Sequence, residues 1–168
     1  MSSEMVTIVN SVNEIIGQAP RTKVRAEGLI HRVTYILVFN AKQQILLQKR
    51  TKIKDIYPSY YDLAAGGVVS AGEEYEASAY RELHEELGLK DIPLKRQFDH
   101  YYDDGHNRYF GRVYTCWHNG PFKLQASEVQ SAEFVNIGQI FESEFEPLTP
   151  DTFSVLEQWL EVNAASSD

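Results

Sequence analysis

The chain has 168 residues, of which 43% are hydrophobic and 24% are charged. These are ordinary globular values, so they exclude a wholly disordered chain, and the length suits one domain with a substantial core. The formal net charge of −8 argues against a nonspecific nucleic-acid binder or a protein that docks on anionic membranes, because both need a basic surface.

No segment resembles a signal peptide, and no apolar stretch approaches the roughly 20 residues of a membrane span. The single cysteine, Cys116, cannot form an internal disulfide, which agrees with a reducing compartment. We therefore expect a cytoplasmic protein in which Cys116 is a buried structural thiol.

Residues 1–30 are predicted to form a hairpin and a short helix that belong to the same domain as residues 31–168. Apolar bursts at residues 6–9 and 14–17 indicate the two strands, and the helix or turn that follows ends at Gly28. Arg21, Lys23 and Arg25 in that helix are interpreted as solvated surface, with a phosphate or partner contact as the alternative.

Residues 31–40 are rich in β-branched and aromatic side chains and predict a long buried strand. A turn leads to a second strand at residues 45–50, which completes a hairpin. Residues 51–59 read as a surface loop beside a site, and residues 60–65 as a further strand that leads into Gly66 and Gly67.

The stretch from Gly67 to Leu89 is a glycine-rich loop that runs into a helix. At 3.6 residues per turn one arc of this helix is apolar and should face the core: Ala79, Tyr80, Leu83 and Leu87. Three carboxylates converge on another arc: Glu82, Glu85 and Glu86. Like charges at this spacing repel, so the pattern indicates either a solvated acidic face or a site for a hard divalent cation such as Mg²⁺ or Mn²⁺.

After this helix, residues 98–102 and 108–117 are predicted to form a hairpin around the turn signal Asp104-Gly105. Gly120-Pro121 should break the sheet, residues 128–135 should re-enter it, and residues 137–141 should form a short helix. Thr149 is the expected N-cap of a terminal helix with the apolar stripe Phe153, Leu156, Leu160 and Trp159. Several strands around two main helices indicate a compact α/β or α+β sandwich.

The spacing of Gly67, Glu73, Arg81-Glu82-Leu83, Glu85-Glu86 and Gly88-Leu89 matches the Nudix box at every defined position. The chain thus resembles the Nudix hydrolases. The resemblance implies an α+β fold, the α/β/α Nudix sandwich, with a mixed β-sheet flanked by helices. It also implies metal-dependent hydrolysis of the diphosphate linkage in a nucleoside diphosphate linked to another moiety.

The resemblance also implies roles for individual residues. Glu85 and Glu86 correspond to ligands of Mg²⁺ or Mn²⁺, Glu82 to a ligand or to the base that deprotonates water, and Gly66 to a ligand through its carbonyl. Glu73 and Arg81 correspond to the structural ion pair of the box. A further catalytic acid often comes from a later loop; Glu128 is our candidate and Glu133 the alternative.

Positive side chains should hold the remaining phosphate charge, and the candidates are Arg50, Arg108 and Arg112, with Lys49 beside them; the alternative is ordinary surface charge. Tyr101, Tyr102 and Tyr109 either stack a base or pack in the sheet. His31 is interpreted as a hydrogen-bonded structural residue, with a metal ligand as the alternative.

Outside the box, residues 31–33, 39–40 and 46–50 resemble isopentenyl diphosphate isomerases, and the whole chain looks most like the uncharacterised bacterial Nudix hydrolases of that branch. The isomerases carry a cysteine and a histidine before the box, where this chain has neither, so we favour a hydrolase. A nucleotide sensor without turnover is the third hypothesis. The expected partner is a small nucleotide diphosphate, and neither nucleic acid nor membrane. A homodimer through the N-terminal hairpin or terminal helix is left open, as is the identity of the substrate.

Overall fold

The computed structural model describes residues 4–166. Its strands are β1 (Met5–Val9), β2 (Ile15–Pro20), β3 (Ile30–Phe39), β4 (Ile45–Arg50), β5 (Tyr61–Asp62), β6 (Lys95–Asp103), β7 (Arg108–Trp117) and β8 (Val129–Val135). Its helices are α1 (Arg21–Glu27), α2 (Tyr75–Leu87), α3 (Ile137–Phe141) and α4 (Pro150–Ser166). Among the described residues, no helix is long and apolar enough to cross a membrane.

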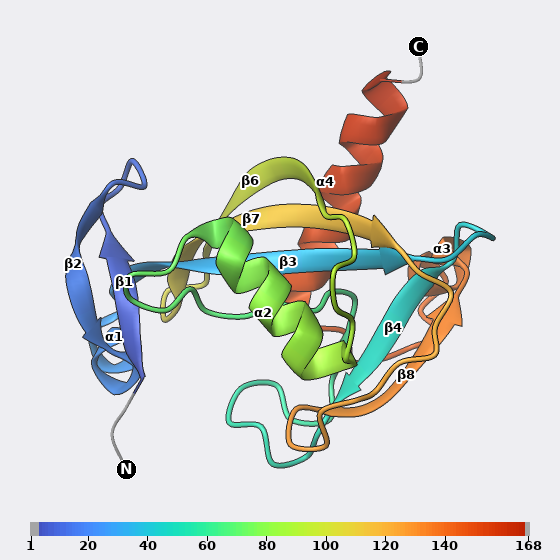
Figure 1. The fold of residues 1–168 in the computed structure, drawn as a ribbon, viewed down its shortest axis with the longest axis horizontal. Helices are drawn as coiled ribbons and strands as arrows, with labels where there is room; N and C mark the ends of the chain where they lie inside the picture. The colour runs from blue at the N-terminus through green and yellow to red at the C-terminus, as the bar shows by residue number, and fades with distance from the viewer. Residues whose placement is uncertain (1–3, 167–168) are drawn as a thin grey trace.

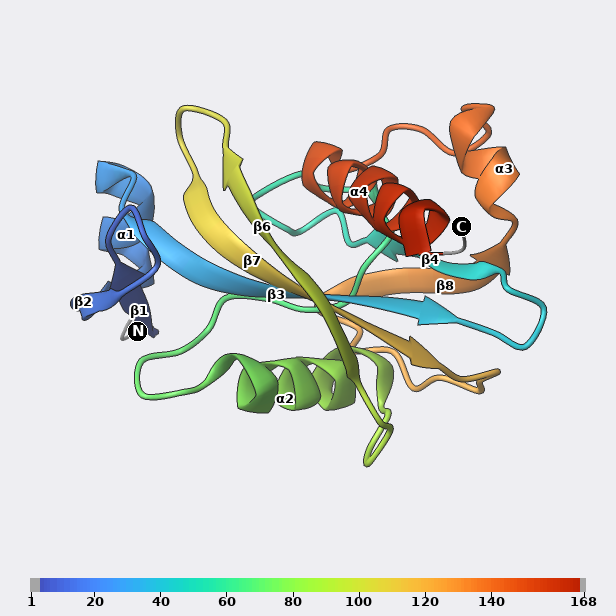
Figure 2. The same cartoon turned by 90° about the horizontal axis from the view of Figure 1, so that it is seen from above.

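A mixed sheet forms the middle layer. Strand β3 runs parallel to β7 along its whole length, β7 pairs antiparallel with β6, and the β1–β2 hairpin joins the sheet beside the start of β3. Figure 2 shows α2 on one face of this sheet and α4 on the other. The expected α+β sandwich is confirmed, as are the N-terminal hairpin and the hairpin of residues 98–117.

Strand β3 is apolar on both faces because both faces are covered. Tyr35, Leu37 and Phe39 pack with Val155 and Leu156 of α4. The alternate residues of β3, Ile36 and Val38, pack on the other face with the buried stripe of α2, which consists of Ala79, Leu83 and Leu87. Tyr80, expected in that stripe, is only half-buried, and its hydroxyl accepts a hydrogen bond from the Leu94 amide at 3.3 Å.

Strands β3 and β4 are joined as predicted, but they diverge directly after the turn. Only Phe39 and Ile45 pair across the hairpin, and β4 then pairs antiparallel with β8. Figure 1 shows β3 and β4 as the two arms of a V that opens away from their connection.

The strand expected at residues 60–65 is shorter than predicted. Only Tyr61 and Asp62 form β5, and beyond them isolated bridges join Ala65 to Ile36 and Val68 to Val33. The pairing is interrupted at Gly66, where φ is +129° and a Cβ would lie 2.0 Å from the Thr34 carbonyl oxygen. Residues 65–69 thus run antiparallel beside β3, in close contact at Gly66, and carry the chain toward α2.

Candidate active site

An open cleft of about 330 Å³ lies in the region where β3 and β4 diverge. Its walls come from segments far apart in the sequence: α1, the first half of β3, the end of β4, residues 54–57, residues 64–68, α2, the β6–β7 turn, residues 125–129 and the start of α4. The acidic arc of α2 faces this cleft.

Glu82 and Glu86 lie one turn apart on α2 and line the cleft. The charge of Glu82 acts on Glu86, and the Gly66 amide donates to Glu86 Oε2 at 3.3 Å. Burial raises the pKa of Glu86 well above its usual range, and the charges of Glu82 and Asp62 raise it further. Burial also raises the pKa of Glu82, against the opposing effect of Arg81. The positive charge near the pair is therefore too small to let both carboxyls ionise readily.

Arg81 connects the loop of the box to its helix. Its Nε and Nη2 donate to the two carboxylate oxygens of Glu73 at 2.8 and 3.0 Å, while Ser70 donates its amide to the same carboxylate at 3.2 Å. Its Nη1 reaches Glu82 and Glu85, each at 3.1 Å. Glu85 lies on the outer rim, with 43% of its side chain exposed.

The described residues contain no group of three or more acidic, histidine or cysteine side chains arranged as a finished metal site. The chemistry of the donors nevertheless fits a hard divalent cation, because Glu82 and Glu86 offer buried oxygens that repel each other without one. Glu85 lines the same cleft and is held by Arg81. The lack of a side chain at Gly67 makes room for Glu82, because a Cβ at this position would lie 2.7 Å from Glu82 Oε1.

The two candidates for the acid outside the box differ in position. Glu128 lines the cleft and forms an ion pair with Lys54, which lines it too. Glu133 is exposed on β8 opposite Leu47 and does not belong to the cleft wall.

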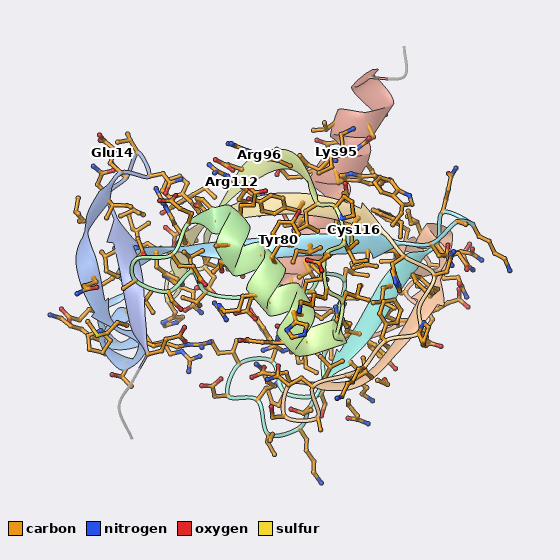
Figure 3. The ribbon with its side chains drawn as sticks, viewed as in Figure 1. Glu14, Tyr80, Lys95, Arg96, Arg112 and Cys116 are labelled. Atoms are coloured by element: carbon orange, nitrogen blue, oxygen red, sulfur yellow. The ribbon has the colours of Figure 1, made fainter. Side chains whose placement is uncertain are left out.

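Two of the three arginines expected to hold phosphate lie away from the cleft. Arg108 donates its Nε to the Gly28 carbonyl at 2.9 Å. Arg112 forms a two-pronged ion pair with Asp99, at 2.7 and 3.0 Å, and lies over the ring of Tyr75; Figure 3 labels it near the start of α2. Side chains alternate along a strand, and Tyr109 between them is the one that lines the cleft. Arg108 and Arg112 thus do not line this cleft, which agrees with the alternative of ordinary surface charge.

The third arginine, Arg50, does line the cleft, but its guanidinium is already bound by the protein. It donates to Asp62 at 3.1 Å and to the backbone carbonyls of Ile56 and Tyr57 at 2.8–3.2 Å. Arg50 thus holds the loop of residues 51–59 against β5. Lys49, also in the cleft wall, lies over the ring of Tyr61.

A second acidic group, absent from the sequence prediction, forms the floor of the cleft. Burial raises the pKa of Asp62 to about 6, helped by the charge of Asp151 and opposed by Arg50. The Tyr35 and Tyr109 hydroxyls each donate to Asp151 Oδ2 at 3.0 Å. No spacing rule could have joined Asp62 to Asp151, since they come from β5 and the first turn of α4.

Of the three tyrosines considered for base stacking, Tyr102 and Tyr109 line the cleft and stack on each other with ring centres 5.1 Å apart. Tyr101 packs on Phe110 outside the cleft. His31 also lines the cleft; its Nδ1 pairs with the Leu29 carbonyl at 3.1 Å, and burial lowers its pKa, which keeps the ring neutral.

Arg21 and Arg25 line the cleft as well, whereas Lys23 between them does not. From the sequence, the three residues are interpreted together as solvated surface. Helical spacing alone could have assigned Lys23 to a different face of the helix from Arg21 and Arg25. It could not have shown what either face contacts.

Comparison with known proteins agrees with this architecture. The NUDIX domain model matches residues 29–159. The uncharacterized Nudix hydrolase YfcD of Escherichia coli K12 is 40% identical over 163 residues, which cover 97% of this chain and 90% of that one. The uncharacterized Nudix hydrolase PA4841 of Pseudomonas aeruginosa is 38% identical over 160 residues and covers 95% of both chains.

Solved structures show the same fold. DR0079 from Deinococcus radiodurans has a TM-score of 0.79 at 22% identity, over 92% of this chain and 98% of that one. The NUDIX domain of Shewanella oneidensis NrtR, solved with ADP ribose, has a TM-score of 0.63 at 17% identity, over 77% of this chain and 86% of that one. From the family match and the close relatives, we conclude that the chain belongs to the Nudix family and is a hydrolase that acts on pyrophosphate bonds.

Proposed function

We propose that the cleft hydrolyses the diphosphate linkage of a nucleoside diphosphate linked to another moiety, with Mg²⁺ or Mn²⁺ as the cofactor. The observation that supports this most is the buried Glu82–Glu86 pair, which faces the cleft with raised pKa values. A divalent cation would lower both pKa values and allow both carboxyls to ionise.

Four residues would hold the cation: Glu82, Glu85 and Glu86 through their carboxylates, and Gly66 through its carbonyl. The cation would neutralise charge on the diphosphate oxygens. Glu86 is the most enclosed of the carboxylates and suits a ligand, whereas Glu82 stands closer to Arg81 and suits either a ligand or the base.

Glu128 is proposed as a further acid of the cleft, where its charge acts on Glu86. Its partner Lys54 is a flexible cation that a substrate phosphate would attract. Once Lys54 turns to the phosphate, the Glu128 carboxylate is free to accept a proton from water.

The test is a phosphate-release screen over nucleotide diphosphates with Mg²⁺ and with Mn²⁺, using the wild type and three variants. We expect Glu86→Gln to lower kcat by at least about 100-fold and Glu128→Gln to lower it as well, because both remove a carboxylate from the reacting region. Glu133→Gln is the matched control and should keep wild-type activity, since Glu133 lies outside the cleft.

Turnover that survives Glu86→Gln would contradict this assignment of the catalytic centre. A loss of activity in Glu133→Gln but not in Glu128→Gln would reverse the choice between these two acids. Saturable nucleotide binding without turnover would indicate a sensor instead, and isomerisation of isopentenyl diphosphate at a comparable rate would indicate an isomerase.

A further inference from the structure

A pair of arginines lines the cleft from outside the region that the family model matches. Arg21 and Arg25 lie one turn apart on α1 and face the same cleft as Glu82 and Glu86. The NUDIX model begins at residue 29, after α1 has ended. The N-terminal segment therefore adds positive charge to a cleft that the matched region builds.

The arginines lie toward the far end of the cleft from the box carboxylates. Helix α1, which carries both arginines, ends at Glu27, and β3 begins at Ile30, so α1 lies by the start of β3 and His31 (Figure 1). Glu82 lies against Gly67, whose carbonyl accepts a hydrogen bond from the Thr34 amide at 2.9 Å, further along β3. At about 3.3 Å per residue, His31 and Thr34 are roughly 10 Å apart along the strand.

An aromatic surface lies at the same end of the cleft as His31. Tyr109 pairs with His31 in the parallel ladder between β7 and β3, and its ring contacts the imidazole edge-on with ring centres 5.4 Å apart. Tyr102 stacks on Tyr109 and lines the cleft beside it. This end therefore combines flat aromatic rings with the two guanidinium groups.

The present partners of the arginines are exposed carboxylates that a ligand can replace. Arg25 pairs with Asp55, whose side chain is 63% exposed, and Arg21 lies 3.6 Å from Glu4, which is 41% exposed. Exposed ion pairs of this kind contribute little to stability. The Asp55 carboxylate on Arg25 occupies the place that an anionic group of a ligand would take.

We propose that Arg21 and Arg25 bind a phosphate monoester of the substrate that is separate from the scissile diphosphate. The inference rests on the proposed function, since it takes the box carboxylates as the place of the diphosphate. The two phosphates of a diphosphate share one bridging oxygen, so both stay near those carboxylates. The guanidinium groups at the start of β3 would therefore bind a different anionic group of the substrate. Arginine is suited to this role because its planar group binds phosphate oxygens in pairs. The preferred substrates are nucleotides that carry this additional phosphate.

The test uses pairs of compounds with the same diphosphate linkage that differ by one phosphate monoester: coenzyme A against dephospho-coenzyme A, and NADPH against NADH. Binding is measured by calorimetry with the whole 168-residue chain in EDTA, so that the result does not depend on turnover. In at least one pair, the wild type should bind the phosphorylated compound about tenfold or more tightly.

The double variant Arg21→Gln with Arg25→Gln should lose this preference, and its circular dichroism spectrum checks that it folds. Lys23→Gln is the matched control, because Lys23 lies on the same helix, pairs with Glu27 at 3.9 Å and does not line the cleft. It should keep the wild-type preference.

Asp55→Asn provides a second test that keeps both arginines. Removing the competing carboxylate should raise the affinity for the phosphorylated compound a few-fold and leave the affinity for its partner compound unchanged. Equal wild-type affinity within both pairs, or a preference that survives in the double arginine variant, would overturn the proposal. A different result would contradict the proposed hydrolysis: turnover would be absent in the wild type, or it would persist in Glu86→Gln.

Discussion

Asp62 has an unusual environment for a carboxyl group beside an arginine. Arg50 donates to it at 3.1 Å, which alone would lower its pKa, but burial and the nearby charge of Asp151 outweigh this and raise the pKa to about 6. An acid that binds its proton more tightly in the folded state destabilises the fold when it is forced to ionise.

The variant Asp62→Asn tests this effect. The folded pKa of about 6 lies above the ordinary value of 3.8, so the folded protein holds a proton that the unfolded chain releases between these values. Wild-type stability should therefore fall as pH rises from about 4 to about 6, by up to roughly 3 kcal/mol relative to the variant.

Urea unfolding of both proteins in EDTA from about pH 4 to pH 7 measures the difference. Comparing the two proteins cancels the other titrating groups, and Arg50 keeps its backbone acceptors in the variant. Parallel stability curves across this range would show that Asp62 ionises normally.

At the scale of the elements, the segment between β5 and α2 depends on one close approach to β3, at Gly66. Ala65 and Val68 pair with β3 on either side of Gly66, so the chain at Gly66 cannot move away from Thr34. The same close approach places the Gly66 amide against Glu86. The packing of this segment thus positions the carboxylates of α2.

Gly66→Ala should lower the free energy of unfolding by about 3 kcal/mol or more, because the new Cβ would meet the Thr34 carbonyl oxygen at 2.0 Å. Gly72→Ala is the control. Its φ of +80° is also unfavourable for alanine, but nothing lies within 4 Å of the added Cβ, so it should cost only about 1 kcal/mol. Chemical denaturation measures both costs, and equal values would mean that backbone conformation alone, and not the contact with Thr34, makes glycine necessary.

At the scale of the whole molecule, two clusters of buried side chains lie on the two faces of β3, one beneath α4 and one beneath α2. Cys116 belongs to the cluster beneath α2, and only 1% of its surface is exposed. Burial raises the pKa of its thiol to about 12, so the reactive thiolate is scarce at neutral pH.

Cys116 should therefore react with an aromatic disulfide reagent only when the fold opens. We expect slow labelling in native buffer, with a rate that rises with urea as unfolding does, and full reaction in guanidinium. Rapid stoichiometric labelling of the native protein, followed by absorbance, would contradict a closed core around this residue.

Local patterns in the sequence predicted most of the elements and the carboxylate arc of α2. The β-branched and aromatic run of β3, the turn between β6 and β7 and the spacing of the box depend on neighbouring residues, which a sequence displays directly. For the same reason helical spacing alone assigns the carboxylates Glu82, Glu85 and Glu86 to one arc.

Other features required the tertiary structure, because they depend on which distant segments meet. Strand β4 diverges from β3 because it pairs with β8 instead. The path of the chain into β8 decides that Glu128 lines the cleft and Glu133 does not. The strand register turned Arg108 and Arg112 away from the cleft, while the docking of α1 brought Arg21 and Arg25 to it. The sequence by itself determined the family and the residues of the box, because these are matters of local spacing; the walls, floor and far end of the cleft were decided by long-range packing, which local spacing does not encode.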